Sequence, residues 1–298
     1  MKQHNTLGFI GLGNMGGRMT QCLVGAGFEV HGYDTDTAKV ESAGAKVCSD
    51  TTELMRLSDI IMLSLPDSRV IETVVEGENG LLSCCRKGQI IIDLSTAAAN
   101  STVRLAKRFV EHGVDYLDAG ISGGAAAAEK GALTLMIGGN KSVLDSISWA
   151  LKPIAARVNY MGESGAGHIT KLINNFLNAV ALSATAEAMV AGRKAGLDLH
   201  ALLDVLNHSS GVNFATLNRF PRIIEGDYLE GGLTGKLMTK DLALYVDCAR
   251  ELGVASLNSA GPLASFGLGT SLGYGDQISN RVVDAIGDVS GSVRLFER

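Results

Sequence analysis

Several common features are missing from the 298-residue sequence, and each absence argues against a class of protein. Only four prolines occur, and no proline- or serine-rich stretch marks a flexible linker. No uninterrupted apolar run reaches the roughly 18 residues that a membrane-spanning helix needs. The glycine-broken start LGFIGLG is too short for a signal peptide. We therefore expect a soluble, cytoplasmic protein that does not bind a membrane.

Cysteine and blocks of like charge are also scarce. The five cysteines form an odd set without a Cys-x-x-Cys pair, and none stands at metal-ligand spacing from a histidine. We expect reduced thiols and no metal site. The 26 basic and 31 acidic residues give a formal net charge of -5, with no Lys/Arg block. Nucleic acid is therefore not an expected partner.

What the sequence does contain is an alternation of short apolar runs and helical stretches between residue 7 and about 161. The expected strands are LGFIGL, FEVHGY, AKVCS, DIIMLSL, QIIIDLS, VDYLDA, ALTLMIGG and RVNYMG. This alternation predicts a mainly parallel sheet with helices on its faces. After Gly167 the strand signals stop, and a helical period continues near 168–195, 198–208, 239–252 and 276–288.

These patterns predict an α/β fold with two domains. Residues 1–163 are expected to form a Rossmann-type domain with a doubly wound sheet, and residues 164–298 an all-helical domain. A long helix that begins near Gly167 is expected to join them, because no linker composition separates the two halves.

A glycine-rich turn between the first strand and a helical stretch is the first candidate site. It has the pattern G-x-G-x-x-G and comprises Gly11, Leu12, Gly13, Asn14, Met15 and Gly16. In that context the three glycines permit a tight turn, close approach of a pyrophosphate and helix packing, and the helix N-terminus favours negative charge. Asp34 ends the second strand, where its carboxylate can bind an adenosine ribose and would repel a 2′-phosphate. We expect NAD as the cofactor in preference to NADP.

A polar stripe lies on the long apolar helix and is the second candidate site. At about 100° per residue its members share one side of the helix. They are His168, Lys171, Asn174, Asn175 and Asn178. Buried lysines are rare unless paired or functional. The stripe equally fits a face that meets solvent or a hydrogen-bond network between domains, and His168 alone is interpreted as structural.

Lys171 has a chemical role open to it, because hydride transfer from an alcohol requires a base for the hydroxyl proton. A free lysine has a pKa near 10.4, so a base near neutral pH needs that pKa lowered by about three, worth about 4 kcal/mol. A helix N-terminus supplies only about 0.3–1 kcal/mol, so burial must supply most of it. Asn175, one turn later, is placed to hold the amine or the hydroxyl.

Ser122 lies in Gly120-Ile121-Ser122-Gly123-Gly124, which matches the Gly-x-Ser-x-Gly pattern of hydrolase nucleophiles. The same pattern fits a loop whose hydroxyl and amides hold a carboxylate. A hydrolase turn needs a helix directly after the serine, and only about six residues precede the next glycine and strand, so we expect no helix there. A carboxylate anchor is the favoured interpretation.

Taken together, the sequence resembles the 3-hydroxyisobutyrate dehydrogenase family, also called the β-hydroxyacid dehydrogenases, over nearly the whole chain. The stretches that carry the resemblance are GFIGLGNMGGRM at 8–19, SLPDSRVIETVVEGENGL at 64–81, DLST at 93–96, DAGISGG at 118–124, GALTLMIGG at 131–139, GAGHITKLINN at 165–175 and KDLALYVD at 240–247. Such an ordered set is far more specific than the glycine motif alone.

The resemblance implies roles for individual residues. Lys171 is implied to be the catalytic acid/base, with Asn175 assisting it. Substrate contacts are expected from Ser122, Gly123, Gly124, Asn174 and Lys240. Leu65, Pro66 and Thr96 are implied to line the nicotinamide, and Lys240 to reach cofactor or substrate.

We therefore expect an NAD(H)-dependent oxidoreductase that interconverts a short 3-hydroxy acid and its semialdehyde, such as 3-hydroxyisobutyrate or tartronate semialdehyde. A homodimer or homotetramer is expected. Two alternatives remain open: an imine reductase-like enzyme on the same fold, and a non-catalytic dinucleotide-binding module. Relatives of both kinds generally lack a lysine at the position of Lys171.

Three departures from the family pattern bear on these expectations. The family usually has proline where Gly120 stands, and the glycine is expected to loosen the strand before the carboxylate loop. Thr20 stands where a smaller residue is usual. The segment GVNFATLNRF after Ser209 lacks a tryptophan that some members carry, so the substrate fit does not transfer.

Overall fold

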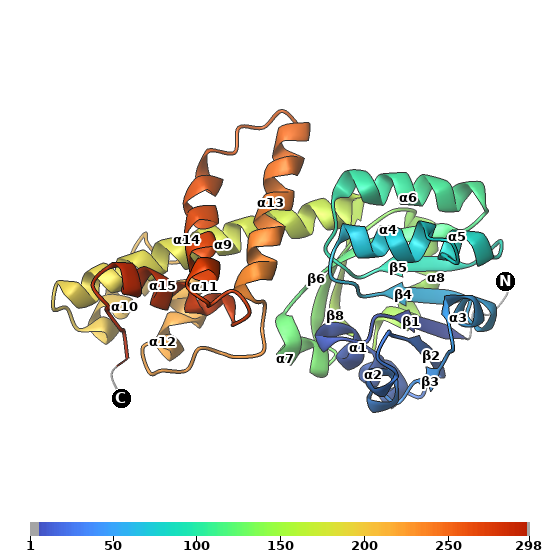
Figure 1. The fold of residues 1–298 in the computed structure, drawn as a ribbon, viewed down its shortest axis with the longest axis horizontal. Helices are drawn as coiled ribbons and strands as arrows, with labels where there is room; N and C mark the ends of the chain where they lie inside the picture. The colour runs from blue at the N-terminus through green and yellow to red at the C-terminus, as the bar shows by residue number, and fades with distance from the viewer. Residues whose placement is uncertain (1–5, 297–298) are drawn as a thin grey trace. The chain divides into compact units, whose positions relative to one another are not determined.

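The computed structural model describes residues 6–296, and the chain divides into two compact units, Met1–Lys171 and Leu172–Arg298. The first unit is α/β and the second is helical (Figure 1). The division falls inside helix α9 (Ala166–Lys194), and the boundary predicted after residue 163 stays a prediction. No helix of the described residues is long and apolar enough to span a bilayer.

One eight-stranded sheet forms the centre of the first unit. Its strands are β1 (Leu7–Ile10), β2 (Val30–Tyr33), β3 (Lys46–Val47), β4 (Ile60–Leu63), β5 (Ile90–Asp93), β6 (Asp115–Ser122), β7 (Leu133–Gly138) and β8 (Ala155–Gly162). They lie in the order β3-β2-β1-β4-β5-β6-β7-β8, and each neighbouring pair is parallel except β6 with β7. Each predicted strand is present, and the order is that of a doubly wound Rossmann-type sheet.

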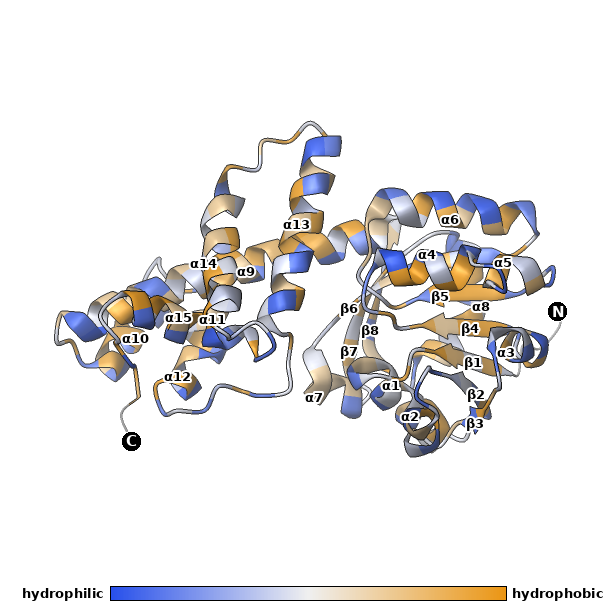
Figure 2. Cartoon of the chain, viewed as in Figure 1, coloured by the Kyte–Doolittle hydropathy of each residue, from blue (hydrophilic) through white to orange (hydrophobic). Residues whose placement is uncertain are grey.

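Helices cover both faces of this sheet. Alternate residues of one strand enter different hydrophobic clusters, as Phe9 and Ile10 of β1 do. One cluster packs under α1 (Asn14–Gly25), α7 (Gly124–Glu129) and α8 (Lys141–Leu151). The other packs under α3 (Thr51–Leu57), α4 (Ser68–Glu76), α5 (Leu81–Cys84) and α6 (Ala99–Glu111), while α2 (Thr37–Ser42) follows β2. The strands between the layers are strongly apolar, as the colouring of β4 and β5 in Figure 2 shows.

The second unit packs helices around a core of its own. Besides α9 it contains α10 (Leu199–Asn207), α11 (Phe214–Asn218), α12 (Phe220–Ile223), α13 (Gly235–Glu251), α14 (Ala260–Ser271) and α15 (Val282–Val289), with 3-10 turns η1 (Leu257–Ser259) and η2 (Ser279–Arg281). Leu182, Met189, Phe220, Met238 and Phe266 are buried together in this core. The helical second half predicted from the sequence is confirmed.

Candidate active site

The glycine-rich turn leaves the carboxyl end of β1 beside β4, where the strand order reverses and open α/β sheets bind their ligands. Gly11 has a φ of 85°, and a Cβ there would collide with the carbonyl oxygen of Ser64. A Cβ at Gly16 would collide with the carbonyl oxygen of Gly11. A Cβ at Gly13 would meet no atom within 4 Å. The first and third glycines are therefore needed for packing, whereas Gly13 leaves open surface at the start of α1 that fits a pyrophosphate.

Within the turn, Leu12 is buried, Met15 is half-buried and Asn14 is exposed. Arg18, one turn along α1, donates hydrogen bonds to the backbone oxygen (2.7 Å) and to the side-chain oxygen of Asn14. The side chain of Arg18 thus stabilises the first turn of α1.

Asp34 lies directly after β2 and holds the glycine-rich turn in place. One of its carboxylate oxygens accepts a hydrogen bond from the amide of Leu12 (2.8 Å), and the other from the amide of Asp36 (3.0 Å). Burial opposes the charge, but these amides and Lys39, 3.7 Å away, outweigh it and hold the pKa of Asp34 below its ordinary value. The group is an ionised carboxylate, which suits a ribose diol and disfavours a 2′-phosphate.

The residues expected beside the nicotinamide leave the same edge of the sheet. Leu65 and Pro66 follow β4, and Thr96 follows β5. The hydroxyl of Ser95 accepts a hydrogen bond from the amide of Leu65 (2.9 Å), and that of Ser68 accepts one from the amide of Ala98 (2.9 Å). The two loops are therefore tied together by serines that the sequence analysis did not single out.

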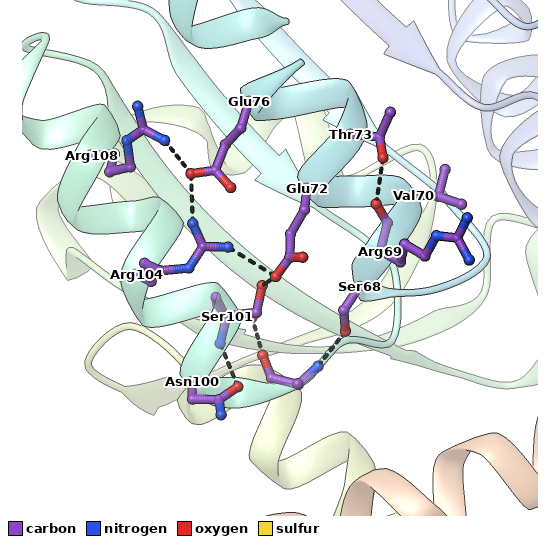
Figure 3. A network of polar contacts seen from close by, with 12 residues as sticks. Ser68, Arg69, Val70, Glu72, Thr73, Glu76, Asn100, Ser101, Arg104 and Arg108 are labelled. Carbon is purple, nitrogen blue, oxygen red and sulfur yellow. Dashed lines mark hydrogen bonds and ion pairs between the residues drawn. The ribbon is translucent and has the colours of Figure 1, made fainter.

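An ionic network fixes the helices that follow these loops (Figure 3). Glu72 of α4 accepts hydrogen bonds from the hydroxyl of Ser101 (2.6 Å) and from Arg104 (2.9 Å) of α6. Glu76, one turn later, pairs with Arg104 (2.5 Å) and with Arg108. Because α4 and α6 begin just after the two loops, the network sets the separation of the loops as well.

The segment Ser122-Gly123-Gly124 ends β6 and begins α7. Gly123 has a φ of 127°, and a Cβ there would stand 2.6 Å from the Cβ of Ala127. Gly124 has a φ of 68°, and a Cβ there would meet no atom within 4 Å. The prediction that no helix follows Ser122 is wrong, because the six residues of α7, mostly alanine, complete a short one. The exposed glycines keep backbone amides accessible.

The N-terminus of α9 is held by a buried aspartate. Asp118 of β6 accepts hydrogen bonds from the amides of Gly165 (2.7 Å) and His168 (2.8 Å). The ring of His168 contacts the hydroxyl of Thr102 (Nδ1, 2.8 Å) and the carbonyl oxygen of Asp93 (Nε2, 3.2 Å). His168 is fully buried, and both ring nitrogens are engaged, as expected of a structural histidine.

Lys171, one turn further along α9, is half-buried and lies against β6. A Cβ at Gly120 would stand 2.6 Å from the Cβ of Lys171 and 2.9 Å from the carbonyl oxygen of Gly167. The helix therefore approaches the strand where the strand has no side chain. The strand is regular there, with Gly120 opposite Met136 of β7, so the expected loosening is not seen.

In the second unit Asn174 and Asn175 of the polar stripe lie near a buried aspartate, whereas Asn178 contacts Arg219. Asn175 is buried and donates a hydrogen bond from Nδ2 to Oδ2 of Asp241 (2.5 Å). The Nζ of Lys240 lies 3.1 Å from the other oxygen of Asp241. Asn174 is exposed and donates to Oδ1 of Asn175 (3.2 Å). Asp241 thus orients two predicted site residues; it stands in the KDLALYVD stretch, yet nothing in the sequence marked it as their partner.

No group of three or more His, Cys, Asp or Glu side chains gathers as a metal site within residues 6–296. The first unit does, however, bring the predicted cofactor residues to one edge of its sheet, except Lys240, which belongs to the second unit. These are Gly11, Leu12, Gly13, Asn14, Met15, Gly16, Asp34, Leu65, Pro66 and Thr96.

Comparisons with known proteins match both units. The family model of the NAD binding domain of 6-phosphogluconate dehydrogenase matches residues 6–162. The NAD-binding model of NADP-dependent 3-hydroxyisobutyrate dehydrogenase matches residues 165–277. The 2-(hydroxymethyl)glutarate dehydrogenase of Eubacterium barkeri is 34% identical over 98% of both chains. The NAD-dependent L-serine dehydrogenase of Pseudomonas aeruginosa is 34% identical over 90% of both.

Solved structures agree. The 3-hydroxyisobutyrate dehydrogenase of Mycobacterium tuberculosis, determined with L-serine, superposes with a TM-score of 0.86 at 28% identity. The match covers 94% of this chain and 98% of that one. The likeness in sequence and fold therefore extends over nearly the full length of the chain.

Proposed function

Because the chain belongs to the β-hydroxyacid dehydrogenase family and is an NAD-dependent oxidoreductase of CH-OH groups, we propose that it interconverts a short 3-hydroxy acid and its semialdehyde with Lys171 as general acid/base. The main supporting observation is the close approach of α9 to β6 at Gly120, which fixes the first carbons of the lysine side chain. NAD, when held by the glycine-rich turn and Asp34, would supply the hydride acceptor for oxidation of the carbinol carbon. Lys171 takes the hydroxyl proton in that direction and returns it in the other.

The other predicted residues receive positioning roles in this proposal. The hydroxyl of Ser122 and the amides of Gly123 and Gly124 hold the substrate carboxylate, since backbone amides and hydroxyls are donors suited to an anion. Asn175 assists Lys171, and its amide is oriented by Asp241. Further contacts are assigned to Asn174 at the substrate and to Lys240 at substrate or cofactor.

The cofactor is assigned to the first unit. The glycine-rich turn takes the pyrophosphate, Asp34 the adenosine ribose, and Leu65, Pro66 and Thr96 the nicotinamide side. The open surface beside Gly13 and the ionised carboxylate of Asp34 support this assignment.

The proposed substrate class is supported by what the names of three relatives have in common, whereas L-threonate, named for a fourth, has no hydroxymethyl group on the carbon that bears the carboxylate. The acids 3-hydroxyisobutyrate, L-serine and 2-(hydroxymethyl)glutarate each carry a hydroxymethyl group on the carbon that bears the carboxylate, and they differ in the third substituent. We assign the present chain to 3-hydroxypropanoates substituted at C2. One carboxylate anchor at Ser122 and one base at Lys171 match the shared part of these molecules.

Two finer assignments complete the proposal. A homodimer or homotetramer is supported by exposed apolar side chains of the second unit such as Leu177, Leu252 and Leu257. A cytoplasmic location is supported by the absence of disulfides among the five cysteines, all of which are free thiols in the described chain.

The decisive experiment is Lys171→Ala assayed on a panel of C2-substituted 3-hydroxypropanoates with NAD. Loss of a positioned acid/base lowers kcat by about 10²- to 10⁴-fold, while NAD affinity stays near that of the wild type. Lys194→Ala at the other end of the same helix, where the amine donates to the carbonyl of Ser290 (2.8 Å), is the matched control and should retain kcat. A Lys171→Ala enzyme with half the wild-type kcat on the best substrate contradicts the assignment.

A further inference from the structure

Arg219, between α11 and α12, has a guanidinium that is held by two side-chain amides. Its Nη2 donates to Oδ1 of Asn178 (3.0 Å), and its Nη1 donates to Oδ1 of Asn280 (2.6 Å). Among residues 6–296 no aspartate or glutamate lies within ion-pair distance of it. Other arginines of the second unit are paired: Arg222 with Asp227, Arg281 with Asp284, and Arg294 with Asp288.

The charge of Arg219 is also partly removed from water. The residue is half-buried, and burial lowers the pKa of its guanidinium to about 10. At neutral pH the group still carries its charge, and amide oxygens solvate that charge without neutralising it. A desolvated cation that lacks a counter-ion is unfavourable. An anion bound there would compensate it.

The amides also pre-organise the guanidinium for such an anion. A guanidinium has five N–H donors in a planar fork, and the two amides leave the others available. Because they come from α9 and from η2, the plane of the fork is fixed from two sides. A fixed planar fork is the arrangement that recognises carboxylates through paired hydrogen bonds.

The place of Arg219 relates it to the proposed site. Asn178 follows Asn175 by three residues on α9, so the two side chains share one side of the helix about 4.5 Å apart along its axis. Asn175 is assigned to the reacting end of the substrate, and Ser122 with its neighbouring amides is assigned to the carboxylate on C2. Arg219 is therefore available for a second anionic group, one turn beyond Asn175.

We propose that Arg219 binds a carboxylate on the C2 substituent, so that dicarboxylic 3-hydroxy acids are the preferred substrates. This inference rests on the function proposed above. The proposed function does not specify the third substituent at C2 of the substrate. The present inference identifies that substituent as a group that carries a carboxylate.

Three compounds separate the distal charge from the rest of the substrate. They are 2-(hydroxymethyl)glutarate, its monoamide at the distal carboxyl group, and 3-hydroxyisobutyrate, which has a methyl group instead. The acid and the amide have the same shape, so their ratio of kcat/KM measures recognition of the charge. For wild-type protein we expect a ratio of about 10 to 150 in favour of the acid, the effect of a hydrogen bond to a charged group.

Arg219→Gln should reduce this ratio to within a few-fold of one, mainly through a higher KM for the diacid, and Arg219→Lys should restore part of it. Arg222→Gln is the matched control, since Arg222 is an exposed arginine three residues later that pairs with Asp227. It should keep the wild-type ratio. Asn178→Ala, which releases one side of the fork, should lower the ratio less than Arg219→Gln does.

Several outcomes overturn the inference. One is a wild-type ratio near one, which needs no variant and so does not depend on whether Arg219→Gln folds. A second is an Arg219→Gln ratio equal to that of wild type. A third is a raised KM for NAD with an unchanged ratio, which assigns Arg219 to a cofactor phosphate. In each case oxidation of 3-hydroxyisobutyrate still supports the proposed function, whereas failure to oxidise any of the three compounds refutes the function itself.

Discussion

Thr20 carries a hydroxyl that is fully buried in α1 without a hydrogen-bond partner among the described residues. Such a group loses about 1–3 kcal/mol of hydration on folding. Thr20→Val keeps the branched shape and removes the hydroxyl. We expect the free energy of unfolding to rise by about 1 kcal/mol, measured by urea denaturation.

Thr102→Val is the matched control for this change. Thr102 is equally buried, but its hydroxyl contacts Nδ1 of His168 (2.8 Å) and the carbonyl oxygen of Ala98 (3.1 Å). Its replacement leaves the imidazole nitrogen unpaired and should lower the free energy of unfolding. Equal effects of the two substitutions would show that the hydroxyl of Thr20 is satisfied after all.

The structural roles of some residues can be predicted from the sequence alone, and those of others cannot. The three glycines of the turn and Asp34 belong to a local pattern, and local geometry dictates which residue each position needs. Asp118 and Asp241 do not, because their partners lie 47 and 66 residues away along the chain. Only the packed fold reveals that one caps the helix of Lys171 and the other orients Asn175.

At the scale of elements, the network between α4 and α6 predicts a pH-dependent contribution to stability. The hydrogen bond from Arg104 is the main cause that lowers the pKa of Glu76 below its ordinary value of 4.5. A carboxyl group whose pKa is lowered on folding stabilises the fold above its unfolded pKa, and this contribution is lost as the pH falls through the folded one. Glu76→Gln should therefore reduce the free energy of unfolding by about 1 kcal/mol at pH 7, a value typical of two partly exposed ion pairs.

The difference between wild type and Glu76→Gln should shrink when the same urea titration is run below pH 4. Glu78→Gln, an exposed glutamate two residues later, serves as control and should stay within about 0.5 kcal/mol of wild type. A difference that grows toward acid pH would mean that Glu76 is destabilised by its surroundings.

Helices and strands also differ in whether the local sequence or distant packing determines them. Strands β1, β4 and β5 are short apolar runs that are buried on both faces, so the sequence alone predicts them. Helix α14, AGPLASFGLGTS, was missed because it is rich in glycine and has no polar face. It is stabilised by the packing of Pro262, Phe266 and Gly269, which propensity cannot reveal.

At the scale of the whole molecule, the separate cores of the two units predict separate unfolding. The single tryptophan, Trp149, lies on α8 against Phe28, with ring centroids 5.4 Å apart. Its fluorescence therefore reports on the first unit. Circular dichroism at 222 nm reports on helices of both. In urea, NAD at 100 times its dissociation constant should stabilise the first unit by about 2.7 kcal/mol.

With NAD, the unfolding transition seen by fluorescence should shift to higher urea by the full stabilisation of about 2.7 kcal/mol. Circular dichroism should resolve a second transition, from the second unit, that shifts less. Adenine alone at equal concentration is the control, because it lacks the pyrophosphate that the glycine-rich turn is assigned. Coincident transitions that shift together would show that the molecule unfolds as one cooperative unit.

Gly120 also bears on how this chain can have diverged from its relatives. A side chain at position 120 and the present path of α9 exclude each other, because a Cβ there would stand 2.6 Å from that of Lys171. A lineage that exchanges proline and glycine here must shift the first turn of α9 before or together with that exchange. A chimera that joins β6 of a family member with proline at this position to α9 of this chain should therefore begin with a steric conflict at Lys171.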